Sequence, residues 1–233
     1  LTKGLITLYI KDASALEKYK MYNWKISPTI RKNRQIKYQN ANINQRVGAY
    51  LPLHFGVRGY DLEFGRLFTE EENLGRKRVA VLGSGVPGEL GTNTSTILNN
   101  EIFIAGTSYK VIGILKEEGS TGWQNPDEEI YIPLLTGVQR LFGTPYVDSI
   151  NVGIRNDTNV DQAMMTIERI LRAQHDIGPG EDNDFRITDY SQFSDLRRQA
   201  TGIFTILIAG IAGISLIVGG IGAVSYTHIR AHE

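Results

Sequence analysis

The residue pattern most suggestive of catalysis is a glycine-rich run, GSGVPG at 83–88, which matches G-x-G-x-x-G and begins at Gly83, directly after an expected strand. In a dinucleotide site such glycines allow a tight turn and place the pyrophosphate at a helix N-terminus. The context opposes that interpretation, because Pro87 lies inside the pattern and the following GELGTNTSTIL is too short and turn-rich for a crossover helix. We therefore expect a surface loop here, and the sequence contains no P-loop motif.

Other patterns for catalysis or metal binding are equally weak. Acidic residues cluster at 70–72, 117–118 and 127–129 without the spacing of a calcium loop. Of the four histidines, only His228 and His232 form a pair at zinc-ligand spacing. There is no cysteine, which removes disulfides and thiolate chemistry, and no G-x-S-x-G motif. The sequence predicts neither an enzyme nor a bound metal or cofactor.

Charge is distributed unevenly along the chain. Residues 1–50 carry ten Lys or Arg and two acids, so a segment of net charge +8 precedes a body of net charge −8. Basic residues interleaved with tyrosines can bind nucleic acid, an anionic membrane surface or an acidic partner, or they can form a solvated sheet face. The solvated face and the membrane or partner surface are favoured over nucleic acid, because the same chain carries an apolar run near its C-terminus.

That apolar run, GIFTILIAGIAGISLIVGGIGAV at 202–224, has no charged residue over 23 positions. As a helix it would measure about 34 Å, against about 30 Å of bilayer hydrocarbon. We expect a transmembrane helix, packed within a bundle, since small residues at spacings of four let a neighbouring helix approach closely. The predicted packing positions are Ala209, Gly213, Ser215, Gly219 and Ala223.

The elements ahead of this run are predicted from periodicity and end signals. Strands are expected at 5–10, in the segments RQIKYQNANI and RVGAYLPL, and at 78–82, 130–133, 149–154 and 185–187. A hairpin is expected at 101–115, and Thr69 with Glu72 has the spacing of a capping box.

Helical signals complete the prediction. A short helix is expected from Asp12 or Ser14 through Lys20, and a helical turn at 133–142. Asn159 is expected to cap a helix whose apolar residues form one stripe, so that 149–187 would be a β-α-β unit. A further helix from Asp189 runs without a breaker into the apolar segment.

The order of several short motifs resembles the MacB-like group of ABC-transporter permeases, which share the FtsX-type membrane domain. The segments are FGVRGYDLEFGRLFTEEE (55–72), RVAVLG, YKVIGIL, IYIPL, QRLFG, VDSINV and ISLIVGGIG (214–222), and together they cover roughly residues 50–224. Positions that the resemblance marks as structural are Gly65, Arg66, Phe68, Gly83, Pro133 and Asp148.

The resemblance implies an α+β fold. A βαβ-containing, porter-like subdomain would comprise residues 1–66 and 145–190, with a mostly-β subdomain, 67–144, inserted between its halves. A stalk and transmembrane helix (191–224) and an atypical tail (225–233) would follow. Residues 1–200 would lie outside the bacterial cytoplasmic membrane.

The resemblance also implies partners. These are a cytoplasmic ABC ATPase, a second permease copy, membrane lipid and, in some members, a periplasmic adaptor with an outer-membrane channel. The chain would transmit the work of ATP hydrolysis to the outside of the cell.

Two departures from the family pattern bear on this hypothesis. The family has a membrane helix before this region and further segments after the second helix, whereas this chain begins at Leu1 and ends in SYTHIRAHE. We expect a fragment that cannot transport by itself. The alternative hypothesis is a membrane-anchored sensor or binding module that works without an ATPase.

Overall fold

The computed structural model describes residues 8–19, 24–120, 125–154 and 158–189, together with positions 208, 211 and 212. Leu1–Arg186 belong to one compact unit and Ile187–Glu233 to a second, and the account below concerns the described residues of the first. Apart from positions 208, 211 and 212, the expected membrane helix at 202–224 lies outside the described residues, and so do all five of its predicted packing positions. Within the described ranges no helix is both long enough and apolar enough to span a bilayer.

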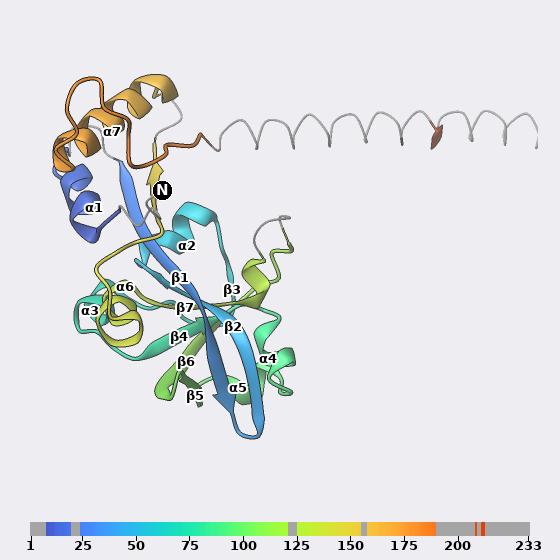
Figure 1. The fold of residues 1–233 in the computed structure, drawn as a ribbon. Coiled ribbons are helices and arrows are strands. Elements are labelled where there is room, and N and C mark those ends of the chain that lie inside the picture. The colour runs from blue at the N-terminus through green and yellow to red at the C-terminus, as the bar shows by residue number, and fades with distance from the viewer. Residues whose placement is uncertain are drawn as a thin grey trace, which may run out of the picture. The chain divides into compact units, whose positions relative to one another are not determined.

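A mixed sheet of eight strands forms the body of the first unit (Figure 1). Its path runs β2-β7-β4-β6-β5-β1-β8, β3 pairs with β6, and β1 also pairs with β2, so the pairing closes on itself. In chain order the strands are β1 (Lys25–Tyr38), β2 (Ala41–Tyr50), β3 (Leu62–Gly65), β4 (Val79–Leu82), β5 (Glu101–Ile104), β6 (Thr107–Leu115), β7 (Glu129–Pro133) and β8 (Ser149–Gly153).

Most helical segments are short and lie between the strands. They are α1 (Ile10–Glu17), α2 (Leu53–Arg58), α3 (Glu70–Leu74), α4 (Val86–Glu89), α5 (Thr94–Ile97), η2 (Pro126–Glu128), α6 (Leu134–Thr136), η3 (Gly137–Phe142) and α7 (Val160–Gln174). Among the helices of the described residues α7 is the long one, and it packs against α1 (Figure 1).

Strand β1 joins the two ends of the sheet. Over its 14 residues it pairs first with β8, from Lys25 to Thr29, and then with β2, from Ile30 to Tyr38. At about 3.3 Å per residue it extends for roughly 46 Å, which explains how one strand serves both partners. Parallel pairing occurs between β2 and β7 and between β4 and β6.

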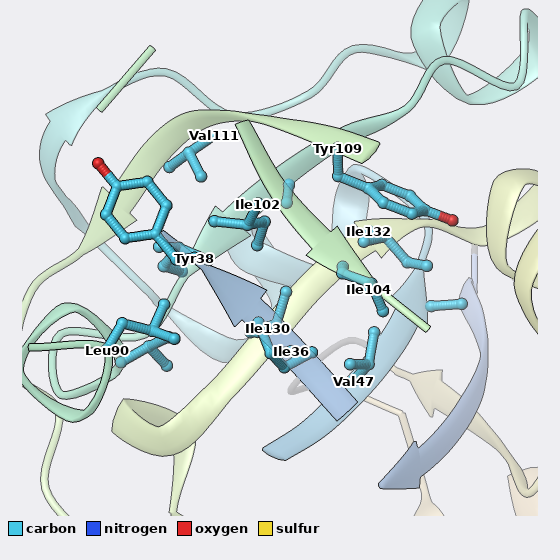
Figure 2. Packing of buried hydrophobic residues seen from close by; sticks show 14 of the residues in the cluster. Ile36, Tyr38, Val47, Leu90, Ile102, Ile104, Tyr109, Val111, Ile130 and Ile132 are labelled. Carbon is cyan, nitrogen blue, oxygen red and sulfur yellow. The ribbon is translucent and has the colours of Figure 1, made fainter. Parts of the chain in front are cut away.

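The core lies on both faces of the central strands, as the continuous burial of β4 requires. Alternate residues of β4 and β7 point to opposite sides: Ala80 and Ile130 join one apolar cluster, and Val81 and Tyr131 join the other. Figure 2 shows the first cluster, in which side chains from β1, β2, β5, β6 and β7 converge.

Several sequence predictions are confirmed. Strand β4, the β5–β6 hairpin and helix α7 form where expected. Asn159 caps α7 by accepting from Gln162 N at 3.1 Å, and Thr69 and Glu72 form the predicted capping box of α3. Four residues of the predicted stripe of α7 are buried: Ala163, Ile167, Ile170 and Leu171.

Other predictions are wrong at their boundaries. RQIKYQNANI is two strands rather than one, because the chain turns between Tyr38 and Ala41, with Gln39 at a φ of 50°. Among the described residues of 5–10, Tyr9 forms one isolated bridge, and Ile10 already begins helix α1. The polar side chain of Asp12 accepts from Tyr9 N, which starts that helix earlier than the periodicity indicates.

The predicted strand at 185–187 does not form, and so the β-α-β unit expected at 149–187 is absent. The physical reason lies in α7. Arg172 donates to the carbonyls of Gly178 and Glu181, and the Phe185 ring packs edge-on against His175. These contacts fix residues 178–185 to the end of α7.

Candidate functional site

The glycine-rich run at 83–88 serves close backbone packing. Gly83 N donates to the carbonyl of Glu129 at 2.8 Å, and Gly85 N donates to that of Asp127 at 2.9 Å. A Cβ at Gly83 would overlap the backbone of Pro126 and Asp127. The glycines are therefore explained by the approach of the segment that enters β7, and the helix that follows, α4, has only four residues.

The Gly-Arg-x-Phe motif fixes the end of β3. Gly65 has a φ of +77° and lies directly against the backbone of β6, where a side chain would collide with the Ile112 carbonyl. Arg66 donates to both carboxylate oxygens of Glu72, at 2.8 and 2.7 Å. Phe68 is buried with its ring edge-on to that of Phe55, at 5.3 Å between centroids. Each motif residue thus has a structural contact.

The remaining predicted positions, Pro133 and Asp148, lie at the ends of strands. Pro133 closes β7 opposite Tyr50 of β2 and precedes helix α6. Asp148 accepts from Arg31 N at 2.6 Å, and its own N–H donates to Thr29 O at 2.9 Å. Asp148 therefore holds β1 where this strand changes partner from β8 to β2.

A largely buried polar cluster also begins at this junction, with the side chain of Arg31. Arg31 Nε donates to the Tyr50 hydroxyl at 2.7 Å, and that hydroxyl donates to Glu129 Oε1. Arg31 Nε lies 3.6 Å from the same carboxylate oxygen. The three side chains come from β1, β2 and β7, so the cluster joins three neighbouring strands.

Gly48 provides the space for this cluster. It lies between Arg31 of β1 and Tyr131 of β7 in the strand register. A Cβ at this position would overlap the Tyr50 ring and the Glu129 carboxylate. The missing side chain therefore lets Tyr50 and Glu129 lie flat over the sheet.

Aromatic rings surround the polar atoms. The His54 ring lies 4.0 Å from that of Tyr50, and the Tyr131 ring lies 5.2 Å from Tyr50 on another side. The Tyr60 ring meets Tyr131 edge-on at 6.1 Å. Tyr131 also donates to Pro126 O at 3.2 Å, which ties the rings to the segment before β7.

Burial dominates the electrostatics of the cluster. It raises the pKa of Glu129, while the charge of Arg31 and the Tyr50 hydrogen bond act in the opposite direction. It raises the pKa of Tyr50 and of Tyr131 well above their ordinary values, with the Glu129 charge adding to the effect. It lowers the pKa of His54 to about 3, reinforced by Arg58 and Arg31.

The arrangement suits a structural role better than a catalytic one. His54 and Tyr50 are buried, with 2% and 1% of their surfaces exposed, so a substrate has no access to their reactive atoms. Tyr50 uses its hydroxyl both as donor and as acceptor. Because a one-residue slip of β7 would turn Glu129 toward the apolar core, the cluster fixes the register of β2 against β7. No group of three His, Cys, Asp or Glu in the described part of the chain is placed to hold a metal ion.

Sequence reasoning missed this cluster. Arg31 was grouped with the basic segment and Glu129 with an acidic run. The RVGAY segment contains a signal, since a glycine two residues before a tyrosine in a strand leaves room on one face. No local sequence pattern connects Tyr50 with Glu129, which lies 79 positions further along the chain.

Comparison with known proteins gives a consistent result. The sequence model of the MacB-like periplasmic core domain matches residues 6–170. The macrolide export ATP-binding/permease protein MacB of Bdellovibrio bacteriovorus is 32% identical over 209 residues, which cover 89% of this chain and 32% of that protein. The same-named protein of a Shewanella species is 30% identical over 227 residues, 97% of this chain and 34% of that one. The chain thus spans about a third of the length of these relatives.

Two solved structures have a similar fold. The periplasmic region of MacB from Actinobacillus actinomycetemcomitans aligns with a TM-score of 0.67 at 23% identity, covering 84% of this chain and 83% of that one. The extracellular domain of the ABC-type transporter YknZ from Gram-positive bacteria aligns with a TM-score of 0.65 at 21% identity, covering 81% and 93%.

Proposed function

The chain belongs to the family of MacB-like periplasmic core domains, and we propose that it is the extracytoplasmic core and second membrane helix of an ABC-transporter permease. The observation that carries this proposal is the family match over 6–170 followed, after a short interval, by the uncharged run at 202–224. The permease couples ATP hydrolysis in the cytoplasm to export or to other work on a substrate outside.

The chain contributes mechanics rather than chemistry to this activity. ATP is hydrolysed by a separate domain or subunit, as the name of the relatives, ATP-binding/permease protein, suggests for the complete polypeptide. The described residues supply a cross-linked sheet: the Arg31–Tyr50–Glu129 cluster resists relative movement of β1, β2 and β7, and the Asp148 contact holds β1 to the start of β8. A stiff domain can transmit a movement of the membrane helices without deforming, whereas a soft one would absorb it.

The division into two subdomains is part of the proposal. Residues 1–66 with 145–190 form the porter-like part next to the membrane, and 67–144 form the inserted part. Strand β1 serves both, since its first residues pair with β8 and its last with β5 of the inserted part.

The membrane helix packs through Ala209, Gly213, Ser215, Gly219 and Ala223 against neighbouring helices of a permease dimer. The partners are a cytoplasmic ABC ATPase, a second permease copy and membrane lipid. In a cell with two membranes, a periplasmic adaptor and an outer-membrane channel extend the pathway. Residues 1–200 lie outside the bacterial cytoplasmic membrane, and no nucleic acid is involved.

Membrane orientation tests the proposal. The chain has no cysteine, so Asp182→Cys in the complete cysteine-free transporter gives one labelling position in this region. We expect a membrane-impermeant maleimide to label it in spheroplasts as fully as after lysis. Labelling only after lysis would place the domain in the cytoplasm and contradict the proposal. Ser14→Cys, also exposed and within the same unit, serves as the matched second position.

A further inference from the structure

A tyrosine hydroxyl is buried without a partner at one end of the first apolar cluster. Tyr109 of β6 is 0% exposed, and its hydroxyl oxygen has no hydrogen-bond partner among the described residues. Figure 2 shows this hydroxyl at the edge of the cluster, pointing away from Ile102 and Val111. A buried polar atom of this kind calls for an explanation, since burial without a hydrogen bond costs free energy.

Two arginines lie near this hydroxyl. Arg78 stands one position before Val79, which pairs with Lys110, so that in the parallel register of β4 and β6 it lies beside Tyr109. Arg140 belongs to η3. Burial raises the pKa of the Tyr109 hydroxyl, and the positive charges of Arg78 and Arg140 act in the opposite direction. Both arginines are exposed, so the hydroxyl lies close to the surface of the unit.

Helix η3, which carries Arg140, is held over this end of the sheet by contacts that do not involve the arginines. Thr136, directly before η3, donates from Oγ1 to Lys77 O at 2.9 Å. Val138 packs in the same apolar cluster as Tyr109. A π-helix such as η3 is rare, and this form is found frequently at functional sites. The fold itself therefore brings the arginine of η3 to the side of the sheet that holds the unpartnered hydroxyl.

Positive charge gathers at this end of the sheet without acidic partners. Within the described ranges, no carboxylate lies at ion-pair distance from Arg78 or Arg140. Two further cations lie at the end of η3, where Lys32 Nζ and Arg34 Cζ are 5.9 and 5.3 Å from the centroid of the Phe142 ring. Charges of one sign that lie together raise the local concentration of ions of the other sign. This end of the sheet therefore attracts anions.

We propose that Arg78, Tyr109 and Arg140 form a binding site for a phosphate group. The guanidinium groups supply charge-assisted N–H donors in the planar arrangement that suits phosphate oxygens, and the hydroxyl supplies a further donor from below. The oxygens of a phosphate point in tetrahedral directions, so they can accept from donors on β6, on η3 and at the start of β4 together. The bound group gives the Tyr109 hydroxyl its hydrogen-bond partner and the two arginines their counter-charge.

The site is a property of the folded unit and does not depend on the proposed transport function. A free phosphate ion and the head group of a phospholipid present the same kind of oxygen atoms. The chemistry of the site is therefore common to both sources, and the experiment separates them.

Titration with inorganic phosphate tests the site directly. In the 233-residue chain in detergent micelles, the Nε–H signals of Arg78 and Arg140 are followed by NMR at constant ionic strength, each assigned by its loss in an Arg→Gln variant. We expect both signals to shift along one saturable curve. Tyr109→Phe should weaken the affinity by about tenfold, as expected for a hydrogen bond to a charged group. Without phosphate this variant should be at least as stable as the parent, because the hydroxyl that it removes has no partner.

Lys110→Gln is the matched control. Lys110 follows Tyr109 on β6, is exposed, and points to the opposite face of the sheet, so the variant removes a positive charge without altering the site. Its affinity for phosphate should equal that of the parent. Equal weakening in Lys110→Gln and Arg140→Gln would reduce the response to general charge attraction and would overturn the proposal.

Micelles doped with phosphatidylglycerol distinguish the two sources of phosphate. A response to inorganic phosphate shows that a free anion is sufficient, and a response to the lipid alone assigns the site to a head group. Arg140→Gln, at an exposed position, should weaken either response by about tenfold while leaving the core intact. The absence of a saturable response to both probes, or an undiminished response in both Tyr109→Phe and Arg140→Gln, would contradict the assignment.

Discussion

Individual residues in this chain act by filling space and by pairing buried charge. The cluster of Arg31, Tyr50 and Glu129 resembles an active site in composition, with a carboxylate, a phenol and a guanidinium within hydrogen-bonding distance. Burial of Tyr50 and Glu129 argues against catalysis by this cluster, because a substrate could not reach their reactive atoms. Their pKa shifts describe the cost of burial, and this cost becomes measurable as a dependence of stability on pH.

His54 gives the clearest such dependence. Its pKa falls to about 3 in the folded unit, whereas an unfolded chain binds the proton near pH 6.5. The unfolded state therefore binds more protons between these values, and stability is lost as pH falls through that window, by on the order of 5 kcal/mol in full. Urea unfolding of His54→Phe, compared with the parent at several pH values, should show that the variant loses less stability on acidification. Equal losses in both chains would contradict the assignment.

Among the secondary-structure elements, strands β1, β2 and β7 are held in register by the hydrogen-bonded side chains of Arg31, Tyr50 and Glu129. Patterns that depend on near neighbours were predictable: the four apolar residues of β4, the stripe of α7, and the capping box at Thr69 and Glu72. Pairings between distant residues were not. The strand expected at 185–187 does not form, because Phe185 packs against His175 at the end of α7. Strand β1 ends before Gln39, which has a positive φ, and glutamine is not a residue type that indicates such a turn.

The candidate site was predictable only in part, for the same reason. The resemblance to MacB-like permeases indicates Gly65 and Gly83 as structural positions. In the structure each of them lies so close to a neighbouring backbone segment that a side chain would collide with it. The sequence does not mark Glu129 as part of a site. Its role depends on Tyr50 and Arg31, which are far from it in the sequence and which only the folded chain brings near.

Gly48→Ala tests how tightly β1, β2 and β7 are joined. The added methyl group would overlap Tyr50 and Glu129, so that one of them must leave its position. We expect a loss of about 1–3 kcal/mol in the free energy of unfolding, as is typical for an overpacked site. Gly88→Ala is the matched control, because a Cβ there meets nothing within 4 Å and its φ needs no glycine. Equal stability of the two variants would mean that the cluster tolerates displacement.

At the scale of the whole molecule, the described unit is a sheet whose strands are joined by a buried polar cluster, and a 23-residue uncharged run follows it in the chain. Family membership and this order of parts support a lever: movement of membrane helices displaces a stiff outer domain. The segment from Asp189 to the run has no proline and no glycine before Gly202, as a continuous helix would require. The central claim is that force passes along this segment.

Inserting Gly-Gly after Ala200 in the complete transporter measures that claim most directly, since two glycines disrupt a helix while leaving both flanking parts intact. ATP hydrolysis and substrate export are measured together in cells or proteoliposomes, with an Ala-Ala insertion at the same place to separate a loss of stiffness from a shift in length. The account predicts that ATPase activity is retained while export is lost with Gly-Gly and is less affected by Ala-Ala. Unchanged export with the Gly-Gly insertion would contradict it.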